Sequence, residues 1–340
     1  MRVAFVTGIT GQDGSYLVEL LLKKNYRVYG IQRRTSLFNT SRIDRLRNRI
    51  TMRYGDLTDG AGLSNYINEI VRDNQDMERF EIYNLAAQSH VAISFEIPEY
   101  TSDVDGMGVM RLLEIIRTLP EDIKNITRFY QAGTSELYGK VLEVPQSETT
   151  PFNPVSPYAA AKLYAYHMVK IYREGYGLYA VNGILFNHES PRRGENFVTM
   201  KIVNGVKDIV SGKKKMIQLG NLNSLRDWGH ARDYVRGMWM MLQQDNPDDF
   251  VLATGERYSV KEFVDKCFKF KNITLTWSGS GLKEVGKDKD GVVRVKVNKK
   301  YFRPCEVDIL LGNPEKAITK LGWHRQYDTL NKLIRDMFGD

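Results

Sequence analysis

Two residues four positions apart, Tyr158 and Lys162, have the chemistry to oxidise an alcohol. They follow Ser156-Pro157, which is typical of the cap and first turn of a helix, so both side chains are expected on one helix face. A nearby ammonium lowers the pKa of a phenol, and this predicts that Tyr158 exchanges a hydroxyl proton near neutral pH. Tyr166 and Lys170 repeat the spacing, but Tyr158 lies on the first turn, nearer the sheet edge where ligands bind.

A short motif after a predicted strand, Gly133-Thr134-Ser135-Glu136, adds a second kind of chemistry. Thr134 can hydrogen-bond the same substrate oxygen as Tyr158. Oxidation of an alcohol needs nothing more, whereas a carboxylate two residues further on suits removal of a carbon-bound proton beside a new ketone. On local sequence alone, a solvent-exposed carboxylate at a loop tip explains Glu136 equally well. The predicted catalytic residues are Thr134, Glu136, Tyr158 and Lys162.

The turn after the first predicted strand has glycines where a dinucleotide would bind. Gly8-Ile9-Thr10-Gly11-Gln12-Asp13-Gly14 lies between that strand and a helix. Glycines there let the backbone approach a pyrophosphate, which then lies at the helix N-terminus. The spacing is G-x-x-G-x-x-G rather than G-x-G-x-x-G, and a plain tight turn is the alternative.

The residues after the second predicted strand favour NADP over NAD. NAD enzymes usually have an acidic residue there, but this chain has Arg33-Arg34-Thr35-Ser36. Two guanidiniums can bind a 2′-phosphate through charge-assisted hydrogen bonds, each contributing roughly 1.5–3 kcal/mol. A basic pair on the surface is the alternative. Asp56, after the third strand, is placed to bond an adenine amino group, and Leu85 to Ser89, after the fourth, to line the ribose and phosphates.

Alternating strand and helix patterns must position these residues. Strands are predicted at Val3–Thr7, Arg27–Ile31, Ile50–Tyr54, Glu81–Leu85, Arg128–Ala132 and Ala180–Phe186, and helices at Gly14–Lys24, Gly62–Arg72, Tyr100–Thr118 and Pro157–Tyr172. Such alternation predicts an α/β fold, a doubly wound parallel sheet of the Rossmann type with helices on both faces. Nearly continuous apolar runs are typical of strands buried on both sides.

The second half of the chain is predicted to form a smaller α/β lobe that binds substrate. Helices are expected at Phe197–Val210, Ala231–Gln243 and Val260–Phe270, short strands at Met216–Leu219 and Phe250–Ala253, and a polar surface loop at Lys283–Lys300. The predicted domains are therefore 1–186 for the cofactor and 187–340 for the substrate, the second partly interleaved with the sheet.

Composition narrows the class of protein. The 340 residues are 42% hydrophobic and 26% charged, which suits a globular chain with a sizeable core rather than a disordered one. No run of 18 apolar residues predicts a membrane span, and the strand starting at Val3 leaves no room for a cleavable targeting peptide. Two cysteines, Cys267 and Cys305, fit a reducing cytoplasm.

The net charge of +8 raises the question of nucleic acid. The basic residues are spread along the chain, however, and no zinc-finger, RNP-type or homeodomain-like pattern accompanies them. A positive cleft for a phosphorylated small substrate explains the surplus as well. The histidines lack metal-ligand spacing, so no metal is expected.

Several motifs together resemble the extended short-chain dehydrogenase/reductase family: Gly8 to Gly14, Asn84 to Ala87, Thr134 to Glu136 and Tyr158 to Lys162. Within it, longer stretches resemble the GDP-mannose 4,6-dehydratases: Arg33 to Thr40, Ala87 to Val91, Asn187 to Gly194, Leu225 to Tyr234 and Arg303 to Asp308. The resemblance covers nearly the whole chain. That group often has Arg-Arg-Ser-Ser after the second strand, so Thr35 is a departure.

The resemblance implies a lyase reaction in which GDP-mannose becomes GDP-4-keto-6-deoxymannose, the first step towards GDP-deoxyhexoses such as GDP-fucose or GDP-rhamnose. It implies that C4 is oxidised transiently with NADP+, that Glu136 removes the C5 proton and helps the 6-hydroxyl leave as water, and that hydride returns to C6. It also implies a homo-oligomer, a dimer or tetramer, in which the Arg33–Arg42 segment reaches a neighbouring subunit.

The resemblance assigns the remaining site residues. The expected cofactor residues are Gly8, Ile9, Thr10, Gly11, Gln12, Asp13, Arg33, Arg34, Thr35, Ser36, Asp56, Leu57, Leu85, Ala86, Ala87, Gln88, Ser89, Tyr100, Lys162, His188 and Arg193. The expected substrate residues are Ser89, Ser135, Asn187, Lys201, Arg226, Arg303 and Glu306. For Arg226 and Arg303, a surface salt bridge is the competing explanation.

Other functions remain open at this point. A reductase of the 4-keto product, alone or as a second activity, and a 4-epimerase use the same core, but neither needs Glu136. A dehydratase of dTDP-glucose would be expected to carry Thr-Asp-Glu, whereas Ser135 stands in the middle here. A non-catalytic NADP-sensing regulator would not need Tyr158, Lys162 and Glu136.

Overall fold

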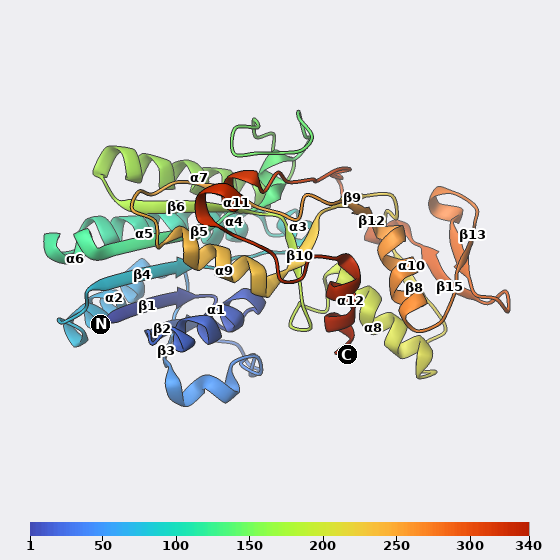
Figure 1. Cartoon of the computed structure of the whole chain (residues 1–340), viewed down its shortest axis with the longest axis horizontal. Helices are drawn as coiled ribbons and strands as arrows, with labels where there is room; N and C mark the ends of the chain where they lie inside the picture. The colour runs from blue at the N-terminus through green and yellow to red at the C-terminus, as the bar shows by residue number, and fades with distance from the viewer. Residues whose placement is uncertain (340) are drawn as a thin grey trace.

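The computed structural model describes residues 1–339 and contains a seven-stranded parallel sheet (Figure 1). From one edge to the other its strands are β11 (Phe250–Leu252), β6 (Tyr179–Leu185), β5 (Thr127–Ala132), β4 (Arg79–Asn84), β1 (Arg2–Thr7), β2 (Arg27–Gln32) and β3 (Thr51–Tyr54). Every neighbouring pair is parallel. The predicted doubly wound fold is confirmed, and the first six strands lie within two residues of their predicted bounds.

Helices cover both faces of this sheet, because its strands are apolar on both sides. One face packs on α2 (Gly60–Asp73), α5 (Gly108–Arg117) and α7 (Pro157–Tyr176). The other packs on α1 (Gln12–Lys23), α9 (Ala231–Met241) and α11 (Glu315–Leu321). The helix predicted at Tyr100–Thr118 is divided: α4 (Pro98–Ser102) leads into a π-helical turn, Asp103–Met107, and then into α5. Shorter helices are α3 (Val91–Ser94) and α6 (Glu121–Ile126), with 3₁₀ turns at Asp44–Arg49 and Ser135–Tyr138.

The helix that carries Tyr158 and Lys162 has clear start and stop signals. Ser156 caps α7 by accepting a hydrogen bond from the backbone N–H of Ala159 at 3.1 Å, and Pro157 occupies the first turn. Gly177 ends it in the left-handed conformation, at φ 67°. Because these local signals set where α7 begins, they place Tyr158 on its first turn, near the carboxyl edge of the sheet.

A smaller lobe lies to the right in Figure 1. Its four-stranded sheet has the order β13 (Thr276–Ser278), β14 (Val285–Lys287), β15 (Val293–Val297), β8 (Ile217–Leu219). It packs with α8 (Val198–Val210), α10 (Val260–Phe270) and α12 (Leu330–Phe338) around one apolar core. Two short strand pairs, β7 (Asn187–Glu189) with β10 (Trp228–His230) and β9 (Leu225–Arg226) with β12 (Tyr258–Ser259), complete this half, with 3₁₀ turns at Gly281–Lys283 and Lys299–Tyr301.

The surface loop predicted at Lys283–Lys300 is wrong, because this stretch contains β14 and β15. Val293, Val295 and Val297 alternate with charged residues, and Val295 and Val297 are buried in the core of the lobe. Period-two alternation is the signature of a half-buried strand. The charged residues before and after the strand hid that signal.

Some segments after residue 186 belong to the smaller lobe, and others belong to the main sheet and the helices that cover it. The strand expected at Phe250–Ala253 joins the main sheet as β11, beside β6. The helices α9 and α11 lie in the core that covers the sheet. The chain therefore leaves the sheet for the lobe and returns, so that residues from distant parts of the sequence meet at the carboxyl edge of the strands.

Candidate active site

The glycine turn after β1 is packed directly against the end of β4. Gly8 has φ 66°, and a Cβ there would stand 2.7 Å from the backbone nitrogen of Ala86. A Cβ on Gly14 would stand 2.3 Å from the carbonyl oxygen of Gly8. The hydroxyl of Thr7 accepts from the N–H groups of Leu85 and Ala86, each at 3.1 Å, which joins the two strand ends. The missing side chains keep the backbone open at the N-terminus of α1.

The first turn of α1 is held by a strand from the second half of the chain. Asp13 Oδ2 lies 2.7 Å from Nε2 of His188, whose Nδ1 lies 2.7 Å from the carbonyl oxygen of Phe186. Burial opposes protonation of His188, but the charge of Asp13 and the hydrogen bond between them raise its pKa. Gln12 donates to the carbonyl oxygen of His188 at 3.1 Å. Predicted cofactor residues separated by 175 positions in sequence are thus in direct contact.

The arginines predicted to select NADP follow β2 and are exposed. Arg33 Nη1 donates to the hydroxyl of Tyr100, another predicted cofactor residue, at 2.6 Å. The Arg34 guanidinium lies over the ring of Tyr54, 5.9 Å from its centroid. At the end of β2, the side-chain oxygen of Gln32 is buried and has no hydrogen-bond partner among the described residues. A buried hydrogen-bond acceptor without a partner destabilises the folded protein. Gln32 directly precedes Arg33 in the sequence, so this open acceptor is at the same end of β2 as the two arginines.

Two other predicted cofactor residues follow β3. Asp56 Oδ1 accepts from the backbone nitrogen and the hydroxyl of Thr58, both at 3.1 Å, so it shapes its own turn. Leu57 is buried, and its carbonyl oxygen accepts from Arg111 at 3.0 Å. These residues lie at the same carboxyl edge as the arginines, but the structure shows no direct bond between the two groups among residues 1–339.

All four predicted catalytic residues are buried at the ends of β5 and α7, each 8% exposed or less. Lys162 Nζ donates to the carbonyl oxygen of Ala132, the last residue of β5, at 3.2 Å. Its Nζ lies 5.9 Å from the ring centroid of Tyr158. Thr134 accepts from the backbone N–H of Glu136 at 3.2 Å and so caps the short turn carrying Glu136. The structure brings the four together.

Tyr166, the alternative to Tyr158, has a packing role. Its ring makes an edge contact with Phe152, at 4.8 Å between centroids, within a separate apolar cluster. Lys170, its partner in the repeated spacing, is half-buried. The choice of Tyr158 therefore agrees with where the two rings lie.

The prediction that Tyr158 exchanges a proton near neutral pH is wrong for the protein by itself, because the pKa of Tyr158 is raised and not lowered. Burial raises the pKa of Tyr158 above its ordinary value, and the charges of Asp105 and Glu136 add to that effect. A hydrogen bond with Thr134 and the charge of Arg193 oppose it but do not outweigh it. The loss of hydration of the phenolate is the largest influence on this pKa, because the side chain of Tyr158 is buried.

The predicted substrate residues gather around Glu136. Arg303 Nη1 lies 3.2 Å from Glu136 Oε1, and the backbone nitrogen of Arg303 donates to Glu306 Oε1 at 2.8 Å. Arg226 is buried, which lowers its pKa, while the charge of Glu136 opposes that shift. The side-chain oxygen of Asn187 is buried without a partner among residues 1–339. Two arginines, Arg303 and Arg226, thus act on the carboxylate of Glu136, and a surface salt bridge does not describe Arg226 because it is buried.

Lys201 lies further out in the lobe. Its Nζ stands 3.2 Å from the ring centroid of Tyr301, on the segment that leads to Arg303. Burial lowers the pKa of Lys201, and Tyr301 partly offsets the shift. This places a basic group on the lobe side of the site, apart from the catalytic four.

Comparison with known proteins agrees with this arrangement. Residues 5–337 match the family model described as GDP-mannose 4,6 dehydratase. The chain is 55% identical to "GDP-mannose 4,6 dehydratase 2" of Caenorhabditis elegans, covering 99% of this chain and 88% of the relative. It is also 55% identical to "GDP-mannose 4,6 dehydratase" of Homo sapiens, covering 99% and 90%.

The chain belongs to the GDP-mannose 4,6-dehydratase family.

Solved structures share the fold of this family member at low sequence identity. A dTDP-glucose 4,6-dehydratase from Bacillus anthracis, in complex with NAD, is 19% identical with a TM-score of 0.79, covering all of this chain and 96% of that one. A UDP-glucose 4-epimerase from Thermus thermophilus, also with NAD, is 22% identical with a TM-score of 0.78, covering 100% and 98%. At such identities the likeness shows the extended Rossmann fold alone.

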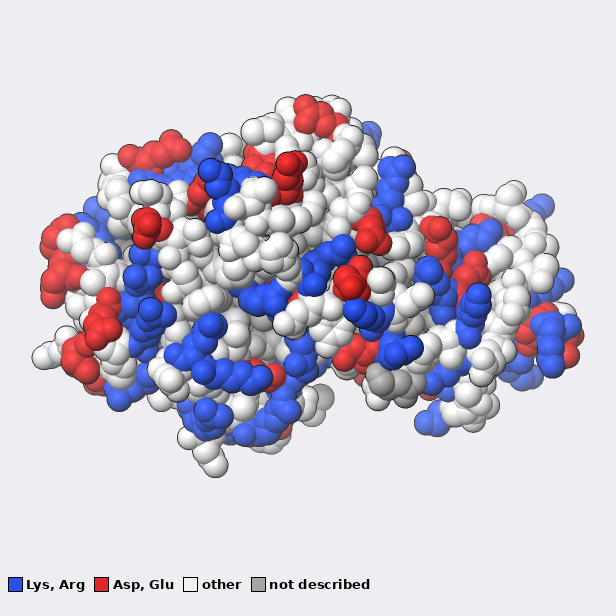
Figure 2. Space-filling view, in the orientation of Figure 1, with Lys and Arg blue, Asp and Glu red and all other residues white. Residues whose placement is uncertain are grey.

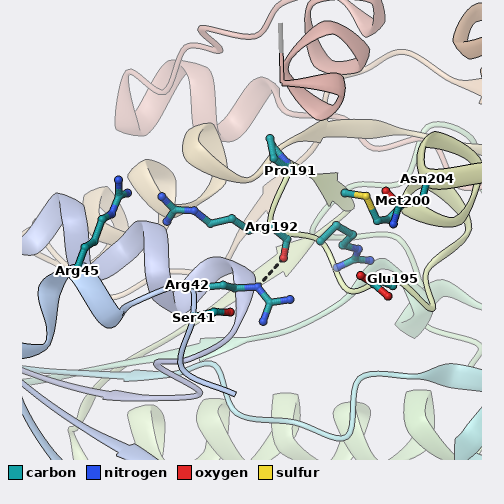
Figure 3. A pocket seen from close by; sticks show the side chains of 9 residues that line it. Ser41, Arg42, Arg45, Pro191, Arg192, Glu195, Met200 and Asn204 are labelled. Atoms are coloured by element: carbon teal, nitrogen blue, oxygen red, sulfur yellow. Dashed lines mark hydrogen bonds between the residues drawn. The ribbon is translucent and has the colours of Figure 1, made fainter. Parts of the chain in front are cut away.

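An arginine-lined hollow of about 520 Å³ adjoins the glycine turn, and the hollow itself was not predicted from the sequence, although Arg193 in its lining was a predicted cofactor residue (Figure 3). Arg42, Arg45, Arg192 and Arg193 line it, together with Glu195. Arg42 donates to the carbonyl oxygens of Arg192 and Thr10, at 2.8 and 3.5 Å. The sequence missed it because its two sides, residues 41–45 and 191–204, are far apart in the chain.

On the face of the molecule that Figure 2 draws, basic and acidic side chains are mixed. Figure 2 shows basic side chains over the segment after β2 and along the boundary between sheet and lobe, with acidic side chains among them. Among residues 1–339, no group of three or more His, Cys, Asp or Glu side chains is arranged to hold a metal ion. None of the described helices is both long and apolar enough to cross a membrane.

Proposed function

We propose that this chain removes water from GDP-mannose and forms GDP-4-keto-6-deoxymannose. The observation that carries the proposal is the position of Glu136, buried beside Tyr158 and paired with Arg303. Oxidation, epimerisation and reduction at C4 need the tyrosine and lysine but not this carboxylate. The membership of the family, at 55% identity over nearly the whole chain, supports the same substrate.

The cofactor of the proposed reaction is NADP. The Gly8 and Gly14 positions, where a Cβ would collide with the backbone, fit a pyrophosphate at the start of α1. Arg33 and Arg34 fit a 2′-phosphate, since no carboxylate stands at the end of β2 to bond a free ribose hydroxyl. When bound, the dinucleotide would accept the hydride of C4 and return it to C6 once water has left, while a proton returns to C5, so that the 6-deoxy product forms with no net use of cofactor. His188 and Arg193 are proposed to border it on the side of the lobe.

The proposed mechanism begins at Tyr158. Its phenolate oxygen takes the proton of the 4-hydroxyl as C4 loses its hydride and becomes a ketone, while Thr134 holds the same substrate oxygen. Burial raises the pKa of Tyr158, and the hydrogen bond of Thr134 and the positive charge of Arg193 oppose that shift. Lys162, whose Nζ lies 5.9 Å from the ring centroid of Tyr158, is proposed to stabilise the phenolate as well.

Glu136 then carries out the elimination. The new ketone acidifies the C5 proton, which the carboxylate removes. The same group, now protonated, gives that proton to the departing 6-hydroxyl, so that water leaves and Glu136 returns to its starting form. A positioned base or acid of this kind contributes roughly 10²–10⁴-fold. Arg226 and Arg303 are proposed to hold the charged part of the GDP-sugar beside it.

One assay tests the function. The protein is incubated with GDP-mannose and a trace of NADP+, and the product is analysed by mass. A nucleotide sugar lighter than GDP-mannose by one water, formed in excess over the cofactor, is expected. A product of unchanged mass indicates an epimerase, and no product in the presence of NADP+ contradicts the proposal.

Assembly into a tetramer is proposed as well. The segment between β2 and the 3₁₀ turn at Asp44–Arg49 presents Leu37 and Phe38, which are 82% and 91% exposed, next to Arg33 and Arg34. Neighbouring exposed apolar side chains on an extended loop are typical of a contact surface.

A cytoplasmic location is proposed from the two cysteines, which are both unpaired.

A further inference from the structure

A carboxylate sealed from solvent, Asp227, directly follows Arg226, one of the predicted substrate residues. It lies between β9 and β10 and is 0% exposed. Its Oδ1 accepts from the backbone nitrogen and the hydroxyl of Thr254, at 2.8 and 2.7 Å. Its Oδ2 accepts from the backbone nitrogens of Gly255 and Gly312, at 3.0 and 3.3 Å. Burying a carboxylate destabilises a protein unless such bonds compensate it, and the proposed reaction gives this one no task.

The four hydrogen bonds join parts of the chain that are far apart in sequence. Residues 254–255 follow β11, the edge strand of the main sheet. Gly312 ends the segment 303–312, which carries two more of the predicted substrate residues. A Cβ on Gly312 would stand 2.2 Å from the Cβ of Ala253, so this segment lies directly against the end of β11. Asp227 therefore attaches both its own strand connection and the segment 303–312 to the main sheet.

The segment 303–312 is also bonded to β9, the strand that carries Arg226. The backbone nitrogen of Leu225 donates to the carbonyl oxygen of Asp308 at 2.8 Å. The backbone nitrogen of Leu310 donates in turn to the carbonyl oxygen of Leu225 at 3.1 Å. The strand and the segment are therefore held to each other as well as to the main sheet.

The position of the Arg226 guanidinium depends on this backbone. The side chain is buried and donates to the carbonyl oxygens of Leu225 and Asp308, at 3.0 and 3.5 Å. Burial lowers the pKa of Arg226, and the charge of Glu136 opposes that shift. Among the described residues, these hydrogen bonds go to neutral oxygens and not to a carboxylate. An anionic ligand would therefore compensate a charge that the backbone holds in place.

We propose that Asp227 is a positioning residue that holds Arg226 where it binds the phosphate groups of the GDP-sugar. Asp227 acts through the backbone and does not touch the substrate, because it is fully buried. A carboxylate suits this task since its two oxygens accept from all four donors, whereas an asparagine has one oxygen and its NH2 would face two of them. The inference rests on the proposed function, in which Arg226 holds the charged part of GDP-mannose.

The test uses GDP as the probe, because its binding needs no reaction. Burial raises the pKa of Asp227 to about 6, so the carboxylate is ionised in calorimetric titrations at pH 8. Asp227→Asn is expected to weaken GDP binding about tenfold, the effect of one charge-assisted hydrogen bond. KM for GDP-mannose should rise by a similar factor, with kcat within about twofold of normal. The control is Asp233→Asn, at a buried carboxylate that accepts from the backbone nitrogens of Gln326 and Tyr327, at 2.9 and 3.0 Å, and that should leave GDP binding unchanged.

Coupling to Arg226 separates positioning from a general loss of stability. Arg226→Met should weaken GDP binding, and adding Asp227→Asn to it should cause almost no further loss, since the two residues act as one unit. If Asp227→Asn does not fold, Thr254→Val removes one donor at nearly constant size and should give a smaller loss that also disappears in Arg226→Met.

Additive losses, equal losses in Asp227→Asn and Asp233→Asn, or an unmodified protein that binds no GDP would overturn the inference. Additive losses in a protein that forms the 6-deoxy product refute the inference alone. Coupled losses in a protein that forms no such product support it and refute the proposed function instead.

Discussion

Replacing Glu136 with glutamine should separate the two halves of the proposed reaction. The amide keeps the shape of the side chain and an oxygen for Arg303, which lies 3.2 Å from the carboxylate. Losing the charged character of that hydrogen bond is worth about 1 kcal/mol, roughly a fivefold change in substrate binding. Losing the base is worth roughly 10²–10⁴ in rate, or about 3–5 kcal/mol. The rate effect should therefore far exceed the binding effect.

Single-turnover measurement distinguishes the outcomes. With GDP-mannose and one equivalent of NADP+, Glu136→Gln should accumulate reduced nicotinamide, up to one equivalent per site, without forming a 6-deoxy product. Tyr158→Phe should block the earlier step, so neither signal appears. Glu143→Gln, at an exposed carboxylate in the loop that follows, should behave normally. A 6-deoxy product from Glu136→Gln within about tenfold of the normal rate would refute the role of Glu136 as the base.

Three further outcomes follow from contacts outside the catalytic four. NADP should bind far more tightly than NAD in titrations, and Arg33→Ala or Arg34→Ala should reduce the difference between the two dissociation constants. Equal affinities for both cofactors in the unmodified protein would contradict this. Light scattering should show a salt-sensitive tetramer that Phe38→Asp weakens, and a fully active monomer would exclude that assembly. Asp249→Ala should lower the free energy of unfolding by roughly 3–5 kcal/mol in urea denaturation, because it removes the buried carboxylate that Arg173 binds at 2.8 and 3.0 Å and leaves this half-buried guanidinium only the carbonyl oxygen of Ala180; a loss under 1 kcal/mol would show that the ion pair contributes little to stability.

The sheet was predictable because its signals are local. The glycine turn after β1 and the cap and proline at the start of α7 each act within a few residues. Strand β15 escaped prediction because a long run of charged residues surrounds its three alternating valines. The π-helical turn at Asp103–Met107 had no signal of its own, since its shape follows from the contact that Gly106 makes with α7.

The sequence by itself determined which chemical groups the protein has and which of them lie on the same turn: Tyr158 with Lys162, and Thr134 with Glu136. These pairings depend on neighbours two or four residues apart. Tertiary structure alone decided their electrostatics. Arg303 meets Glu136 across 167 positions of sequence, and burial sets the pKa of Tyr158 against the direction expected from Lys162. Desolvation and distant charges arise only when remote segments close around a group, so the spacing of residues along the chain carries no record of them.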